Sequence, residues 1–172
     1  MSVPTDETPP VTCLDNIILQ EHEVKVILQI TNVNKASGPD GISPRLLKIA
    51  SDIVAKPLCY IFNLSLAKMY YPLAWKLANV IPVFKKDERN YIGNYRPISL
   101  LSVISKTFER CIYKHIMNFI RDLLSEHQSG FMLKDSTRNQ LLYLTHVFSK
   151  ALDEGKDIRI VFFDISKAID CV

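Results

Sequence analysis

Asp164 is the residue of this chain whose position best suits metal chemistry. It follows residues 158–163, a run of Ile, Val and Phe that predicts a buried strand. Ser166 is then a candidate N-cap for a following helical turn that contains Asp170. A carboxylate at the carboxyl end of a buried strand is a common metal ligand, and a solvated turn aspartate has the same local pattern. Both interpretations stay open on these residues alone.

Basic residues gather in the middle of the chain and suggest a second kind of chemistry. Between positions 76 and 114 eight Lys or Arg residues stand against three acidic ones, although the whole chain has a net charge of only +3. This balance permits a phosphate-rich ligand, and a solvated surface gives the same pattern. Upstream, Lys35 precedes a turn with Gly38 and Gly41, which is either a phosphate-approaching loop or an ordinary connector.

Composition indicates an ordinary globular protein. The 172 residues suit one domain, and 48% apolar with 23% charged residues argues against disorder. The four cysteines have no zinc-ligand spacing and suggest thiols in a reducing compartment. No signal peptide and no apolar run of bilayer length is evident. We therefore expect a soluble, intracellular protein without a membrane partner, in the nucleus or the cytoplasm.

The periodicity of apolar residues predicts an alternation of helices and short extended segments. Pro57 is expected to open a helix, Pro82 to mark an edge strand or bulge, and Gly155 to close the last helix. Residues 1–13 are expected to be loose. Helices are predicted over 21–30, 43–50, 57–69, 102–123 and 137–152, and extended segments over 77–84, 94–99 and 158–163.

Five blocks of sequence, in this order, resemble the amino-terminal half of the reverse transcriptase domain of non-LTR retrotransposons, the LINE-type or jockey-like mobile elements. Each block alone is modest, but their order is specific, and they extend over residues 33–172. The blocks are KASGPDG (35–41), WK with VIPVFKK (75–86), NYRPISL (94–100), QSGF with Ser136-Thr137 (128–137) and FDISKAID (163–170).

The resemblance implies an α+β fold, a helix-rich partial right-hand polymerase with the fingers and the first palm strand but an incomplete palm sheet. It divides the chain into an N-terminal segment (1–32), partly loose and then helical, a fingers-like region (33–157) and the first catalytic strand and turn of the palm (158–172). An α+β polymerase of this kind transfers nucleotides with two divalent ions, and Mg²⁺ is the expected cofactor.

The resemblance also assigns roles to individual residues. Asp164 matches a catalytic metal ligand, with the backbone carbonyl of Ile165 as a second ligand. Lys85 and Arg96 match positions that contact the incoming nucleotide, together with Ile165 and Ile169. Ile169 departs from the family, which usually has Phe there to exclude the ribose 2′-hydroxyl, so sugar discrimination is expected to be weaker.

Two glycine-containing blocks are the expected nucleic-acid contacts. Gly38 and Gly41, and likewise Gly130 and Phe131, are expected to lie along template or primer, although turn geometry alone explains the glycines. After Phe131 the chain has Met132, Leu133 and Asp135 where basic residues are usual. The family's partners are an RNA template, a DNA primer and deoxynucleoside triphosphates; the sequence gives no oligomeric state.

We therefore expect a fragment of an RNA-directed DNA polymerase of a mobile element. The Tyr-x-Asp-Asp block that supplies the second catalytic acid is not among these 172 residues, so the fragment alone is expected to be inactive. The alternative is a non-catalytic nucleic-acid-binding remnant that uses its basic fingers. A chain that folds poorly, because its palm strand lacks partners, is the third possibility.

Overall fold

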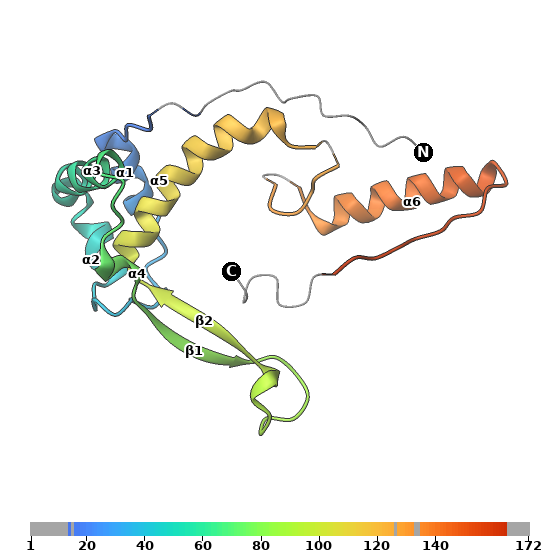
Figure 1. Ribbon diagram of the computed structural model, residues 1–172, viewed down its shortest axis with the longest axis horizontal. Coiled ribbons are helices and arrows are strands. Elements are labelled where there is room, and N and C mark those ends of the chain that lie inside the picture. Colours follow the sequence, from blue (N-terminus) through green and yellow to red (C-terminus); the bar gives the residue numbers. More distant parts are fainter. Residues whose placement is uncertain (1–13, 15, 126, 133–134, 165–172) are drawn as a thin grey trace. The chain divides into compact units, whose positions relative to one another are not determined.

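Three helices of this computed structural model share one apolar core, and a β-hairpin follows them in the chain (Figure 1). The structure describes residue 14 and residues 16–125, 127–132 and 135–164. These fall into two compact units, Met1–Asp122 and Leu123–Val172. This division differs from the motif-based regions 1–32, 33–157 and 158–172, because the first helix packs in the same core as later ones.

That core forms where α1 (Glu21–Gln29) contacts α3 (Ser51–Ala67) and α5 (Val103–Ile120). Val24, Leu28 and Phe62 are fully buried in it. A ring cluster closes one side, with the Phe62 and Phe108 ring centroids 4.9 Å apart and Trp75 5.4 Å from Phe108. Trp75 is therefore a packing residue, as the sequence suggested.

Local capping explains where several helices begin. The backbone N–H of Gln20 donates to the carboxylate of Glu23 at 3.0 Å, at the start of α1. Ser43 accepts a hydrogen bond from the Arg45 N–H at 3.1 Å and is followed by Pro44, which opens α2 (Pro44–Ile49). These helices confirm the predictions made from their periodicity.

Pro57 does not open a helix, and that prediction is wrong. α3 begins six residues earlier, at Ser51, and Pro57 lies inside it. Proline removes only the one backbone donor that would reach the carbonyl of Ile53. Ala55 on one side of Pro57 and Leu58 on the other are both buried in the core. Tertiary packing of this face therefore favours a continuous helix over a break.

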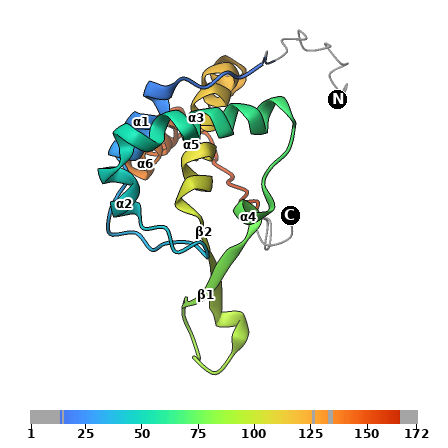
Figure 2. The same ribbon diagram turned by 90° about the vertical axis from the view of Figure 1, so that its left-hand side faces the viewer.

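β1 (Ala78–Phe84) and β2 (Tyr95–Leu101) form an antiparallel two-stranded sheet, preceded by the short α4 (Leu73–Lys76) and joined through a 3₁₀ turn, η1 (Ile92–Asn94). The register pairs Ala78 with Leu101 and Phe84 with Tyr95. Both views show the strands extending away from α1 and α3 of the same unit (Figure 1, Figure 2). With two strands both are edges, so the position of Pro82 in an edge strand is confirmed.

A second 3₁₀ turn, η2 (Arg121–Leu123), follows α5, and the second unit contains α6 (Thr137–Asp153). Ser136 caps α6 by accepting from the Asn139 N–H, and Gly155 ends it in a left-handed conformation, with φ of +66°. No described residue of α6 is buried, so its predicted apolar stripe, including Leu141 and Val147, is exposed. Among the described residues no helix is long and apolar enough to cross a membrane.

Residues 158–164 do not form the predicted buried strand. The structure assigns them no strand, and Val161, Phe162 and Phe163 are 71%, 89% and 92% exposed. A strand requires a neighbour for its backbone hydrogen bonds, and no described segment pairs with this one. The predicted Ser166 cap and its helical turn lie outside the described residues, as do residues 1–13.

Candidate active site

The hairpin brings Lys85 and Arg96 onto one face. Arg96 lies opposite Val83 in the register, and the Lys85 N–H donates to the Asn94 carbonyl at 2.8 Å, which extends the ladder by one pair. Side chains alternate along a strand, so Lys85 lies on the same side as Val83 and diagonally from Arg96. Two cations far apart in sequence thus become neighbours through the strand pairing.

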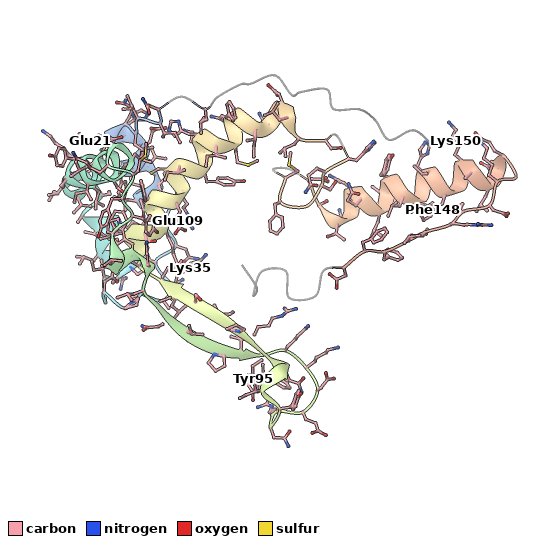
Figure 3. All side chains as sticks on the ribbon, in the orientation of Figure 1. Glu21, Lys35, Tyr95, Glu109, Phe148 and Lys150 are labelled. Atoms are coloured by element: carbon pink, nitrogen blue, oxygen red, sulfur yellow. The ribbon has the colours of Figure 1, made fainter. Side chains whose placement is uncertain are left out.

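The opposite face of the hairpin stabilises its turn. The rings of Phe84 and Tyr95 stack edge to face with centroids 5.6 Å apart, and the guanidinium of Arg89 lies 5.0 Å from the Phe84 centroid. The Tyr95 hydroxyl donates to the Arg89 carbonyl at 2.7 Å, and Tyr95 is seen at the turn end of β2 in Figure 3. These contacts leave the other face to Lys85 and Arg96.

Lys85 and Arg96 have no anionic partner within the described chain. Neither side chain forms an ion pair there, whereas Lys25 pairs with Asp52 at 2.7 Å. Arg96 is exposed, as is Lys85. A planar guanidinium beside a point-like ammonium suits a ligand with several phosphoryl oxygens.

Gly38 is buried by packing, which gives it a role that does not require a ligand. An added Cβ would lie 2.6 Å from the carbonyl carbon of Leu101, where β2 ends. Gly41 differs, because it has φ of +68° and no atom lies within 4 Å of the place that a methyl group would take. Its N–H donates to the Gly38 carbonyl at 3.1 Å, which closes the predicted turn. Of the two glycines, only Gly41 has an open side towards a ligand.

Gly130 and Phe131 lie in a hollow before α6. Phe131 is 96% exposed with a left-handed φ of 65°, which is unusual for a bulky side chain. Asp135 lines the same hollow, and hydrogen bonds from the Ser129 side chain and the Ser136 backbone lower its pKa, so it stays charged. This charge favours ring stacking by Phe131 over a phosphate contact at this place.

Asp164 is exposed at the end of the described chain (Figure 1). Ile165 and Ile169, the other expected ligands to metal and nucleotide, lie outside the described residues. In the described parts of the chain no group of three or more His, Cys, Asp or Glu side chains is arranged to hold a metal ion. The carboxylate of Asp164 is the oxygen donor type that Mg²⁺ prefers, and Mg²⁺ also keeps water and substrate phosphates as ligands.

With this geometry known, comparison with known proteins identifies the family. A family model described as "Reverse transcriptase (RNA-dependent DNA polymerase)" matches residues 83–172, more than half of the 172-residue chain. The chain belongs to the reverse transcriptase family. The match includes β2, the end of β1 and the segment that contains Asp164. The resemblance stated from the five sequence blocks is thereby confirmed.

The relatives of this reverse transcriptase come from non-LTR mobile elements. Three Drosophila melanogaster proteins are similar over most of the chain. The probable RNA-directed DNA polymerase from transposon BS is 31% identical over 96% of this chain, and that from transposon X-element 35% over 86%. The RNA-directed DNA polymerase from mobile element jockey is 30% identical over 87%. The chain spans 19%, 16% and 17% of their respective lengths.

Reasoning from sequence missed one group of cations in this reverse transcriptase. Lys106 and Arg110 entered only as part of the basic middle, yet they lie beside Lys35 at the same hollow. The signal was present, because residues four apart on a helix share one face. What the sequence did not show was the loop that lies against that face.

Proposed function

We propose that the hairpin face with Lys85 and Arg96 binds the triphosphate of an incoming deoxynucleotide during RNA-directed DNA synthesis. The observation that carries this proposal is the pairing register, which brings both cations to one exposed face without an anionic partner among the described residues. Arg96 would contact two phosphoryl oxygens at once, and Lys85 would supply a point charge. Both contacts stabilise negative charge that shifts along the triphosphate during transfer.

Asp164 is proposed to hold a divalent ion for the same reaction, with the backbone carbonyl of Ile165 as a second ligand. Bound Mg²⁺ supplies Lewis-acid stabilisation of the attacking oxygen and the triphosphate. Asp164 contributes an exposed carboxylate to this site. Ile169 is proposed to contact the sugar, where a branched aliphatic side chain replaces the usual aromatic ring.

The nucleic-acid partners are proposed to be an RNA template and a DNA primer. Phe131 is 96% exposed, which suits stacking against an unpaired base. Gly130 beside it and Gly41 in the first turn are proposed to let a strand approach the backbone. Gly38 is proposed to act indirectly in this contact, since its packing against Leu101 holds the turn in place.

Binding of a nucleotide tests the proposal directly. A fluorescent deoxynucleoside triphosphate is titrated with the purified chain in Mg²⁺ while anisotropy is measured. The double variant Lys85→Gln/Arg96→Gln is expected to bind at least about tenfold more weakly, because two charge-assisted contacts are lost. Arg89→Gln is the matched control: it removes a cation from the same hairpin but from the Phe84 side. Equal losses in both variants would contradict the proposal.

A polypeptide of these 172 residues alone is proposed to bind nucleotide without polymerising it, because Asp164 is the only catalytic carboxylate matched. Primer extension on an RNA template with Mg²⁺ checks this, and clear extension contradicts it. The alternative function, a nucleic-acid-binding remnant, is supported by the basic middle of the chain. It predicts RNA binding that falls steeply with salt and no measurable binding of the triphosphate.

A further inference from the structure

Three cations surround a small hollow between residues 31–36 and one face of α5. Lys35 comes from the KASGPDG block, and Lys106 and Arg110 come from the first half of the helix. Figure 3 shows Lys35 beside this part of α5. Lys35 and Arg110 are exposed, and Lys106 is half-buried. Among the described residues that line the hollow, none is acidic.

The spacing along α5 explains how the helix contributes to this hollow. Val103, Lys106, Thr107 and Arg110 all line it, and their separations of three, four and seven residues place them on one helical face. The hydroxyl of Thr107 already donates to the Val103 carbonyl at 2.8 Å. The cationic side chains are therefore the donors available to a ligand here.

Acidic residues near this part of the fold are engaged elsewhere. Asp40, in the same loop as Lys35, accepts from the Ser102 hydroxyl at 2.5 Å and from the Ile42 N–H at 3.2 Å. Glu109 accepts from the Tyr71 hydroxyl at 3.1 Å on another face of α5. None of the three cations at the hollow forms an ion pair within the described chain.

The size of the hollow limits what enters it. Its volume is about 20 Å³, which admits about one water-sized group, such as a single phosphoryl oxygen. Positive charge continues beyond it, because Lys48 donates to the carbonyl of Thr31 at 3.5 Å and Thr31 lines the hollow. A chain of phosphates uses both the hollow and the further charge, whereas an isolated phosphate uses only the hollow.

We propose that Lys35, Lys106 and Arg110 bind a backbone phosphate of a single-stranded nucleic acid. The proposal rests on the proposed function only for the choice of ligand. It assigns a second phosphate site to the chain, separate from Lys85 and Arg96, and it gives the KASGPDG block a binding residue in Lys35 besides its glycines. The ligand contacts the helix face and the loop together, so the packing that holds them in register is part of the site.

Salt-dependent RNA binding tests this site without nucleotide or Mg²⁺. Binding of a short unstructured RNA is measured by anisotropy across a series of salt concentrations. Lys106→Gln/Arg110→Gln is expected to weaken binding about tenfold or more at low salt. It should also lower the slope of log affinity against log salt by about 1.4, which is about 0.7 for each lost phosphate contact on a single strand.

Matched variants make the result specific. Lys56→Gln/Lys68→Gln removes the same charge from exposed positions on and next to α3, outside the hollow, and should change affinity and slope little. Lys106→Arg/Arg110→Lys keeps both charges and should retain most of the binding, which controls for damage to α5. Circular dichroism and Trp75 fluorescence check that each variant folds.

Several outcomes would overturn the proposal. These are no RNA binding by the unaltered chain, equal losses in the two Gln pairs, or competition by inorganic phosphate at the same concentration as RNA phosphate. The last result would assign the hollow to free phosphate. Because this assay contains no nucleotide, its failure is distinguishable from failure of the triphosphate proposal, which is read with the Lys85 and Arg96 variants.

Discussion

Ser102 and Asp40 join the KASGPDG block to the start of α5. The Ser102 hydroxyl donates to Oδ2 of Asp40 at 2.5 Å and accepts from the Ile104 N–H at 3.1 Å. One side chain therefore caps an 18-residue helix and holds a loop 62 positions earlier in the chain. Gly38 packs against the backbone of the same place. This link keeps Lys35 beside the helix face with Lys106.

Replacement of Gly38 tests how tightly this loop packs. Gly38→Ala should destabilise the first unit by about 2 to 3 kcal/mol, because the new methyl group meets backbone atoms of Leu101 and Ser102 that cannot rotate away. Urea unfolding followed by tryptophan fluorescence measures the change. Gly41→Asn is the control: its left-handed φ is tolerated by Asn and the space around it is open, so little change is expected. Equal effects at both positions would contradict this packing.

The cap and the loop contact should be energetically coupled. Ser102→Ala is expected to cost about 1 kcal/mol for the lost cap, and Asp40→Ala loses the same side-chain contact from the other end. The double variant should cost less than the two single effects together, by about 1 kcal/mol, because both remove one shared hydrogen bond. A double-mutant cycle from urea unfolding gives this number, and additive effects would show that the contact contributes nothing.

Periodicity predicted most elements because it reports burial on one face. α5 and the hairpin strands were found in this way. Pro57 was misjudged, since the rule that proline opens a helix is local, while the buried side chains on both sides of it act through tertiary packing. Residues 158–163 have the composition of a buried strand, but a strand also needs a paired neighbour, which composition does not provide.

The candidate site was predictable in its residues but not in its grouping. The resemblance pointed to Lys85 and Arg96, and only the register showed that they share a face. Gly38 was predicted as a nucleic-acid contact, and the structure adds a packing reason that no sequence pattern distinguishes from binding. The cations at α5 were missed because the loop that completes their hollow lies far upstream in the chain.

The ring cluster should dominate the stability of the first unit. Phe62 is 0% exposed and touches both Trp75 and Phe108. Phe62→Ala is expected to cost about 3 to 5 kcal/mol through lost burial and a cavity. Trp75 is the one tryptophan of the chain, so its fluorescence reports unfolding of this cluster. Phe131→Ala, at a 96% exposed ring, should leave that transition in place; a similar loss there would contradict the assignment.

Cys111 should be the unreactive thiol of the core. Burial, with a smaller effect from the charge of Glu23, raises the pKa of Cys111 to about 12. Because the thiolate is the nucleophile, the reactive fraction at neutral pH falls about a thousandfold relative to a free cysteine. Alkylation with iodoacetamide, followed by peptide mass spectrometry, should label Cys111 only in denaturant. Rapid labelling in native buffer would show that the α1–α5 contact opens.

Glu23 should produce part of the acid sensitivity of the first unit. Partial burial raises its pKa, but the hydrogen bond from the Gln20 backbone, and then the charges of His115 and Lys114, lower it more, so the net shift is downward. A carboxyl whose folded pKa is depressed stabilises the fold above its unfolded pKa, about 4.3, and loses that contribution as pH falls through the lower folded value. The carboxylate lies 3.3 Å from His115 and 3.7 Å from Lys114. Glu23→Gln should therefore lower stability at neutral pH and flatten the decline below about pH 4.3. Urea midpoints measured across this pH range check the expectation, and a decline as steep as in the unaltered chain would contradict it.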